Sequence, residues 1–313
     1  RMIEEKMLLN LRLGKISKWF SGIGQEAVSV GLTMAMQPDE YILPMHRNLG
    51  VFTSRGIPLD KLFMQLQGSY NGFSKGRERS FHFGTNDYHI VGMISHLGPQ
   101  LGIADGIALA ELLRTRGRDP LKKNKGELKT TAVFSGDGGT SEGDFHESLN
   151  VAAVWDLPVL FIIENNAYGL STPVSEQYKC KALVDKAIGY GMESYQIDGN
   201  NLLEVYDRIL TLRNSMKKKP RPVLIECMTF RMRGHEEASG VKYVPKELFE
   251  KWEIKDPVKN YEAYLKELGL LSDETIQDLR SKFKSDIEAG LDKAFAQPKI
   301  VPDTTYEVKD VYA

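Results

Sequence analysis

Cysteine is scarce in this sequence: Cys180 and Cys227 are the only 2 among 313 residues, and they lie far apart. Neither a CxxC pair nor a Cys/His cluster at zinc-ligand spacing occurs, so the sequence suggests no disulfide framework and no structural zinc site. This usage fits a reducing compartment, and we expect the cytoplasm of a bacterium or, in a eukaryote, the mitochondrial matrix. Because the sequence begins at Arg1 and not at Met, a removed targeting segment stays open.

Long apolar runs and an excess of charge of one sign are also lacking. No run approaches the roughly 18 to 20 apolar residues that cross a bilayer. The 41 basic and 42 acidic residues give a net charge of -1, so we expect neither nucleic acid nor a membrane as partner. With 42% hydrophobic and 27% charged residues, the composition is that of a globular protein with a sizeable core.

The middle of the chain alternates between apolar runs and helical patterns. The runs at residues 130–135, 158–163 and 222–227 predict strands, and the last two are apolar enough for burial on both faces. Helical spacing predicts one helix at residues 101–112, before the first strand, and another at residues 200–217, between the last two strands. The fold class is therefore α/β, with a mostly parallel sheet covered by helices on both faces.

The end of the chain is helical in pattern. We expect residues 1–245 to form the α/β domain, and residues 246–313 to form a helical C-terminal extension and tail of the same domain. Ser272 is a plausible N-cap, and residues 298–313 are expected to be an extended tail. One apolar helical stripe follows the cap, formed by Ile276, Leu279, Phe283 and Ile287.

Two polar signatures directly follow predicted strands: Gly136-Asp137-Gly138 and Asn165-Asn166. The carboxyl ends of parallel strands meet at one edge of a sheet, so one crevice could hold both. Glycines let backbone N–H groups approach an anion, and a carboxylate with an amide oxygen suits Mg²⁺ beside a phosphate. The glycines and aspartate alone would be an ordinary strand-to-helix turn, but paired amides at a strand end have no packing use.

Together the two signatures resemble the thiamine-diphosphate fingerprint, with 26 residues between GDG and NN. Beyond them, the chain resembles the alpha subunit of the thiamine-diphosphate-dependent, decarboxylating first component of 2-oxo acid dehydrogenase complexes, the pyruvate and branched-chain family. The similarity runs through nearly the whole length. Five blocks carry it in order: residues 22–27, 45–50, 143–150, 171–173 and 230–235.

The resemblance implies a thiamine-diphosphate-binding fold and a site for thiamine diphosphate and Mg²⁺. It makes Asp137, the Asn166 side chain and the Tyr168 carbonyl the metal ligands. The residues that it places at the cofactor are His46, Arg47, Ser95, Leu97, Gly136, Asp137, Gly138, Gly139, Asn166, Tyr168 and His235. Within that set, Arg47 pairs with the diphosphate, and Ser95 and Leu97 hold the aminopyrimidine. Without the resemblance, Arg47 would be a surface ion-pair residue and residues 95–97 a plain loop.

His82 and His235 match the two active-site histidines of the family, near the reacting carbon and the incoming lipoyl group; taken alone, such histidines are more often structural. The implied reaction is decarboxylation of a small 2-oxo acid, with acyl transfer to the lipoyl group of an acyltransferase component. The glutamate that activates the cofactor belongs to the beta subunit in this family, and no matching motif occurs here. A beta subunit or fused beta half should therefore share the site, with α₂β₂ as the expected assembly.

Two segments depart from the family pattern. Glu236 stands where animal members carry a regulatory serine, which excludes phosphorylation at that position and leaves only Ser239 nearby. Ile94 and Pro99 replace hydroxyl residues of the potassium-binding loop of branched-chain enzymes, so we do not predict potassium.

The substrate and two rival functions stay open. Residues 171–178 are similar to branched-chain enzymes, which favours a branched 2-oxo acid over pyruvate or acetoin. A transketolase-like carboligase half and a noncatalytic cofactor-binding subunit are the rival functions that share the motif. A nucleotide-binding Rossmann protein is excluded, because no GxGxxG follows the first strand of a βαβ unit.

Overall fold

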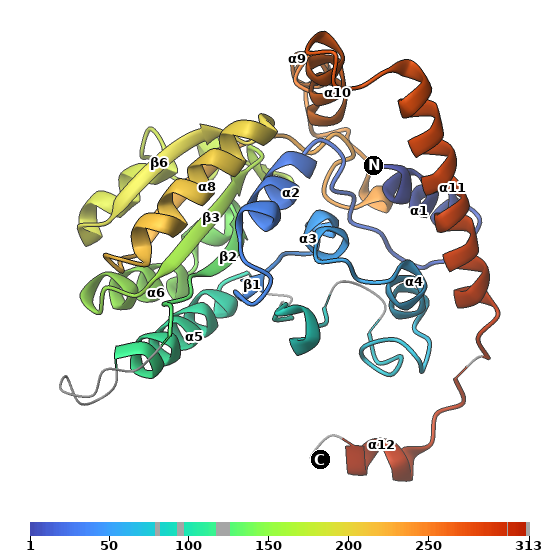
Figure 1. The fold of residues 1–313 in the computed structure, drawn as a ribbon, viewed down its shortest axis with the longest axis horizontal. Coiled ribbons are helices and arrows are strands. Elements are labelled where there is room, and N and C mark those ends of the chain that lie inside the picture. Colours follow the sequence, from blue (N-terminus) through green and yellow to red (C-terminus); the bar gives the residue numbers. More distant parts are fainter. Residues whose placement is uncertain (79–81, 93–96, 117–125, 299, 311–313) are drawn as a thin grey trace.

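The computed structural model describes residues 1–78, 82–92, 97–116, 126–298 and 300–310 (Figure 1). A five-stranded sheet in the order β1-β2-β3-β7-β6 forms its centre, and every neighbouring pair in it is parallel. The strands are β1 Ile42–Leu43, β2 Thr131–Gly136, β3 Val159–Asn165, β7 Val223–Met228 and β6 Glu193–Asp198. A short antiparallel pair, β4 Tyr168–Gly169 and β5 Thr172–Pro173, follows β3. The predicted parallel sheet is confirmed, and its three predicted strands lie within two residues of the observed ones.

The central strands are apolar because both of their faces are covered. Every residue of β2 and β3 is buried, and alternate side chains enter different cores. Phe134 and Ile162 belong to the core beneath α2 Glu26–Ala35 and α8 Leu202–Met216, whereas Val133 and Phe161 belong to the core beneath α5 Pro99–Arg116 and α6 Gly143–Val154. Figure 1 shows α8 and α5 on opposite sides of the sheet.

The edge strand β6 was not predicted. Its sequence, ESYQID, is mostly polar and only one of its six residues is buried. Such a strand lacks the hydrophobic signal that identifies the central strands, and it forms because β7 offers a free edge for parallel pairing.

Further helices lie outside the four that cover the sheet. The α-helices are α1 Met2–Arg12, α3 Leu49–Ser54, α4 Leu59–Gln67, α7 Val174–Gln177, α9 Lys246–Glu253, α10 Pro257–Glu267, α11 Asp273–Phe295 and α12 Thr304–Asp310. The 3₁₀ segments are η1 Asn86–Tyr88, η2 Gly138–Ser141, η3 Leu183–Tyr190 and η4 Glu237–Ser239. No helix in the described ranges is long and apolar enough to cross a membrane.

The long helix α11 agrees with the sequence prediction at its N-cap and differs in which side chains it buries. Ser272 does cap α11, accepting a hydrogen bond from the N–H of Thr275 at 3.1 Å. The predicted stripe is buried only at its ends, because Leu279 and Phe283 are exposed while Ile287 reaches the core with Leu291. The C-terminal half of α11 packs on α4, and its middle spans open surface (Figure 1).

The expected extended tail instead contains α12. Lys75 forms an ion pair with Asp310 at 2.7 Å, and Arg77 pairs with Glu307 at 2.6 Å. The tail is therefore ordered by charges more than 200 positions away in the chain, which no local pattern can indicate. The prediction of an extended tail was wrong for this segment.

The parallel arrangement brings several chain segments to the same edge of the sheet. In the registered pairs Gly136 lies beside Glu164, and Asn165 lies beside Met228. Each strand then leaves the sheet at its carboxyl end, so Asp137, Asn166 and the segment from Thr229 start from adjacent points. The loop after β1, which carries His46 and Arg47, starts from the next strand along.

A buried ion pair anchors α8 to the segment that leads into β1. The Arg213 Nε atom lies 2.6 Å from Glu40 Oε2, and both side chains are almost wholly buried. Glu40 also accepts hydrogen bonds from the N–H groups of Gln37 and Thr130. The glutamate thus satisfies three donors from three separate segments.

We expect Glu40→Ala to lower the free energy of unfolding by about 3–5 kcal/mol, because it leaves the Arg213 guanidinium buried without a counter-charge. The double variant Glu40→Leu/Arg213→Met should recover most of that loss. Urea unfolding monitored by circular dichroism measures both. A single variant as stable as the wild type would show that the pair does not hold this segment.

Candidate functional site

Asp137 lies at the end of β2 with its carboxylate almost fully buried. Its Oδ2 accepts a hydrogen bond from Gln177 Nε2 at 2.9 Å, and the backbone N–H of Asn166 also bonds the carboxylate. Burial raises the pKa of Asp137, and the Gln177 hydrogen bond and the positive charge of Arg231 partly offset this. The structure therefore brings together the two elements that the sequence places 26 residues apart.

The two asparagines have different surroundings. Asn165 Nδ2 donates to Glu226 Oε1 at 2.6 Å, which ties β3 to β7. Asn166 Oδ1 lies 3.4 Å from the N–H of Tyr168, and its Nδ2 lies 3.5 Å from Gln25 Oε1. The Asn165 amide is thus held by a neighbouring strand, whereas the Asn166 backbone bonds Asp137, so Asn166 is the candidate ligand.

The turn after Asp137 needs glycine because two backbones meet there. A Cβ atom on Gly138 would lie 3.1 Å from the Cα of Gly169, and one on Gly169 would meet Gly138 at the same distance. Gly169 belongs to the β4–β5 turn, in which Ala167 and Leu170 both have positive φ angles, of 71° and 55°. Left-handed backbone at residues other than glycine is unfavourable and concentrates at functional sites.

Two buried arginines face one histidine. Arg47 Nη2 and Arg231 Nη1 each lie 3.1 Å from His235 Nδ1. A guanidinium can only donate, so Nδ1 accepts and the proton of the neutral imidazole is on Nε2. Burial, followed by the charges of Arg47 and Arg231, lowers the pKa of His235 to about 4.

Both guanidinium groups otherwise contact neutral acceptors. Arg47 donates to the carbonyls of Ser21 and His235 at 3.1 and 2.5 Å. Arg231 donates to the carbonyl of Leu170 at 2.8 Å, and its buried Nε has no hydrogen-bond partner among the described residues. Burial and the nearby Arg231 charge lower the pKa of Arg47 to about 9.

His46 completes this cluster. Its ring is half-buried and tilted against Phe20 with centroids 4.7 Å apart, and its buried Nε2 finds no partner in the described part of the chain. Burial and the charge of Arg47 hold the pKa of His46 well below its ordinary value. The guanidiniums of Arg47 and Arg231 and two nitrogen atoms without partners, Arg231 Nε and His46 Nε2, therefore lie at the edge of the sheet that carries Asp137. A multivalent anion such as a diphosphate fits that donor set.

The structure describes all but one of the predicted site residues. Gly136 and Gly139 border Leu97, whose carbonyl accepts from Ser135 Oγ at 3.4 Å. His82 Nδ1 lies 3.9 Å from Glu78 Oε2. Ser95 lies outside the described residues, as does Ile94.

Three residues near the site had no predicted role. Arg231 lies in one of the quoted sequence blocks, yet only the fold shows that it faces Arg47. Glu164, directly before the two asparagines, is fully buried, and burial raises its pKa to about 7. Gln25 joins Glu164 to Asn166. A glutamate at the end of the apolar run VLFII was the one available signal, because a charge at the end of a buried strand requires partners.

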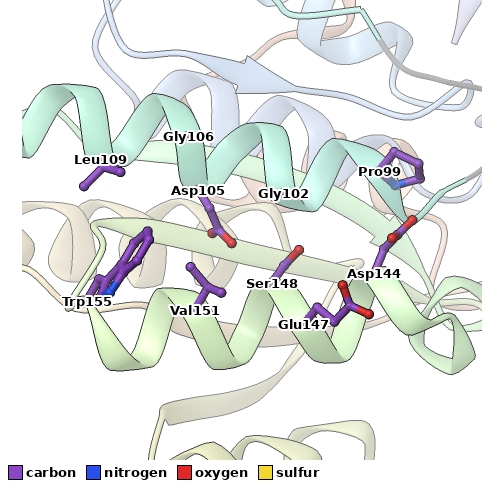
Figure 2. Close-up of a pocket in the computed structure, with 10 residues that line it drawn as sticks. All are labelled: Pro99, Gly102, Asp105, Gly106, Leu109, Asp144, Glu147, Ser148, Val151 and Trp155. Carbon is purple, nitrogen blue, oxygen red and sulfur yellow. The ribbon is translucent and has the colours of Figure 1, made fainter.

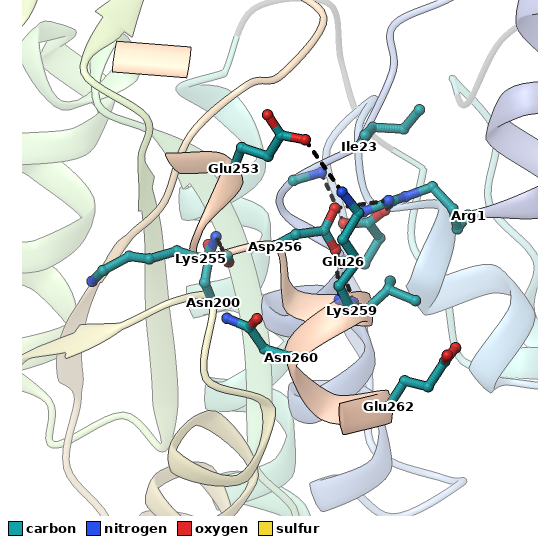
Figure 3. Close-up of polar contacts among 12 residues, drawn as sticks. Arg1, Ile23, Glu26, Asn200, Glu253, Lys255, Asp256, Lys259, Asn260 and Glu262 are labelled. Atoms are coloured by element: carbon teal, nitrogen blue, oxygen red, sulfur yellow. Dashed lines mark hydrogen bonds and ion pairs between the residues drawn. The ribbon is translucent and has the colours of Figure 1, made fainter. Parts of the chain in front are cut away.

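A separate groove of about 350 Å³ lies between α5 and α6 (Figure 2). Figure 2 shows the Asp105 side chain pointing from α5 toward Ser148 and Val151 of α6. Its carboxylate is buried, its Oδ1 has no partner among the described residues, and burial raises its pKa to about 8. One end of the groove reaches Asp144. Gly98, the residue directly after Leu97, packs against Asp144.

The sequence relationships agree with this geometry. Residues 1–303 match the family model of the dehydrogenase E1 component. The chain is 36% identical over 322 residues to 2-oxoisovalerate dehydrogenase subunit alpha of Bacillus subtilis (strain 168), covering 100% of this chain and 92% of that protein. It is 31% identical to the pyruvate dehydrogenase E1 component subunit alpha of the same organism, covering 96% of this chain and 76% of that protein.

A plant relative is similar over a smaller share of its own length. The mitochondrial 2-oxoisovalerate dehydrogenase subunit alpha 2 of Arabidopsis thaliana is 34% identical over 304 residues, which is 96% of this chain and 61% of that protein. The chain thus spans about three fifths of the plant relative. It belongs to the dehydrogenase E1 component family, as the sequence resemblance predicted.

The pKa of Asp105 predicts how stability depends on pH. A folded pKa of about 8 against an ordinary 3.8 means that folding disfavours the ionised form, so the free energy of unfolding should fall as pH rises through that window. Asp105→Asn should therefore stabilise the chain by about 1–3 kcal/mol at pH 8 and by nothing at pH 4. Thermal unfolding across this range tests it, and a stabilisation independent of pH would contradict the assignment.

We expect His235 to stay neutral down to about pH 5, because burial disfavours its charged form and two guanidiniums face its Nδ1. Arg231→Met should move its pKa upward, toward the ordinary value near 6.5. The Cε1–H resonance of His235, followed by NMR against pH, measures both. Arg280→Met, at an exposed position on α11, is the matched control. An unchanged His235 titration in Arg231→Met would contradict the contact.

Proposed function

We propose that this chain is a thiamine-diphosphate- and Mg²⁺-binding alpha subunit that catalyses the oxidative decarboxylation of a 2-oxo acid, with acyl transfer to a lipoyl group. The observation that supports it is the buried Arg47–His235–Arg231 cluster beside the Asp137–Asn166 pair. Buried cations without carboxylate partners are unfavourable unless an anion completes them. Membership of the dehydrogenase E1 component family supports the same cofactor.

Each group of residues would hold one part of the cofactor. Asp137, Asn166 Oδ1 and the carbonyl of Tyr168 form an oxygen donor set of the kind that Mg²⁺ prefers. Arg47, Arg231 and His46 would bind the diphosphate, together with the N–H groups around Gly136, Gly138 and Gly139. Leu97 and Ser95 would contact the aminopyrimidine. When bound, the thiazolium supplies the electron sink that decarboxylation of a 2-oxo acid needs.

The chain's own contribution concerns protons and positioning. His235 is neutral and its Nδ1 is occupied by two guanidiniums, so Nε2–H is the atom that can donate to a substrate or cofactor oxygen. His82, whose side chain is part-exposed, can exchange a proton with solvent and is the second candidate for proton relay. Burial, followed by the charges of the arginines, keeps both neighbouring imidazoles neutral at physiological pH, so His235 would act as a neutral hydrogen-bond donor.

The substrate proposed is a branched 2-oxo acid. The matches to 2-oxoisovalerate dehydrogenase subunits are 34% to 36% identical, whereas a pyruvate dehydrogenase and an acetoin oxidoreductase subunit of B. subtilis are 31% and 32% identical. The segment at residues 171–178 supports the same choice. It forms β5 and α7 and carries Gln177, which bonds Asp137.

The proposed partners are a beta subunit or beta half that completes the site, in an α₂β₂ assembly, and a lipoyl-bearing acyltransferase component. The groove between α5 and α6 supports a protein partner close to the cofactor. It begins at Asp144, and the exposed Trp155 and Val154 border its other end. We place the protein in the cytoplasm of a bacterium or in the mitochondrial matrix of a eukaryote.

Calorimetry with thiamine diphosphate and Mg²⁺ tests the shared site. We expect weak or absent binding to this chain alone, and a dissociation constant lower by at least about 100-fold with the beta partner, because the partner supplies the remaining contacts. Asp137→Ala should abolish Mg²⁺-dependent binding in the complex without unfolding the chain. Asp278→Ala, an exposed carboxylate on α11, is the control.

Equal affinity in the chain and in the complex would contradict the shared site, and unchanged affinity in Asp137→Ala would contradict the metal assignment. Turnover that proceeds fully without a lipoyl carrier would instead favour a transketolase-like carboligase.

A further inference from the structure

A buried row of hydrogen bonds connects the candidate metal ligand Asn166 to the loop that carries Arg47. Asn166 Nδ2 lies 3.5 Å from Gln25 Oε1, and Gln25 Nε2 donates to Glu164 Oε2 at 2.6 Å. The other carboxylate oxygen, Oε1, accepts from Asn48 Nδ2 at 2.7 Å. Asn48 Oδ1 in turn accepts from the N–H of Met45 at 2.7 Å. The four side chains are at most 6% exposed.

The row has a direction that Glu164 sets. Both oxygens of Glu164 accept, from Gln25 Nε2 and from Asn48 Nδ2, whereas an amide donates at one end and accepts at the other. Because Glu164 accepts from Gln25 Nε2, Gln25 presents its oxygen to Asn166. Asn166 must then donate to that oxygen through its nitrogen. The oxygen of Asn166 is then turned to the opposite side, where the N–H of Tyr168 lies 3.4 Å away.

That direction matters for a cation. An amide oxygen has lone pairs that bind Mg²⁺, whereas an amide nitrogen carries hydrogens and does not. An Asn166 turned over by 180° would occupy the same volume and lose the metal. Both orientations are sterically equal, so hydrogen bonds choose between them: the N–H of Tyr168 at 3.4 Å on the oxygen side and Gln25 Oε1 at 3.5 Å on the nitrogen side.

The other end of the row is fixed by the backbone. Asn48 cannot turn over without placing its NH₂ group against the N–H of Met45. A change at Glu164 must therefore be absorbed on the other side, by Gln25 and Asn166. Little water reaches these atoms to replace a lost partner, because Gln25 and Glu164 are among the most buried polar residues of the chain.

We infer that Glu164 is a positioning residue, which acts through Gln25 to hold the Asn166 amide with its oxygen toward the metal. This rests on the proposed function, because it presupposes a cation beside Asp137. The same carboxylate also holds Asn48, the residue after Arg47, so one side chain aligns the metal half and the diphosphate half of the site.

The first test is Glu164→Gln in the assembled complex. The new amide must donate with one end, yet it faces two donors, and Asn48 is fixed. Gln25 should turn over and force Asn166 to present nitrogen to the cation. We expect the Mn²⁺ dissociation constant, measured by EPR at saturating thiamine diphosphate, to rise by about 10- to 100-fold, with the thermal unfolding midpoint little changed.

Two further variants separate orientation from charge. Gln25→Met keeps the Glu164 charge and breaks the row, so it should weaken Mn²⁺ binding as Glu164→Gln does; an effect of charge alone predicts no change. The swap Gln25→Glu/Glu164→Gln restores an acceptor for Asn166 Nδ2 and should recover affinity to within about threefold of wild type.

The outcomes are distinguishable from failure of the proposed function. If the wild-type complex binds no Mn²⁺ with thiamine diphosphate, the proposed function is wrong. If the wild type binds and Gln25→Met binds equally well, the positioning role is wrong while the proposed function stands. If Glu164→Gln fails to fold, Gln25→Met still decides.

Discussion

The site depends on two positive charges that the fold confines beside one neutral imidazole. Arg47 and Arg231 lie far apart in the chain, and both are buried with only carbonyl and imidazole acceptors around them. Such an arrangement is unfavourable by itself, because buried charge requires compensation. It keeps His235 and His46 neutral, lowers the pKa of Arg47, and leaves buried nitrogens without partners. Each of these features is accounted for by an anion with several oxygens.

The parallel sheet is what makes this confinement geometrically simple. Strands β1, β2, β3 and β7 end at one edge, so the loops that carry Arg47, Asp137, Asn166 and Arg231 start from neighbouring positions. The apolar strands bury both faces and hold those starting points rigidly. Cationic and metal-binding groups then lie side by side, as a metal-bound diphosphate requires.

Sequence reasoning found the parts of this design that are local. The strands ending at Gly136 and Asn165 are readable because buried runs are apolar, and the Asp137–Asn166 proximity follows from their parallel order. Gln25 and Glu164 escaped notice because their partners lie 116 to 141 positions away, and Arg231 because the charge that it faces, Arg47, comes from a distant segment. The predictions of one apolar stripe on α11 and of an extended tail were wrong for the same reason. Contacts with distant residues decide which α11 side chains are buried and whether α12 forms. The edge strand β6 carries too few apolar residues to be recognised.

The most direct test of this account is the crystal structure of the assembled protein with Mn²⁺ and thiamine diphosphate, using the anomalous signal of manganese. The account predicts one anomalous peak in direct contact with the Asp137 carboxylate and Asn166 Oδ1, with the diphosphate between that ion and the guanidiniums of Arg47 and Arg231. A manganese peak remote from Asp137, or a diphosphate that touches neither arginine, would contradict it.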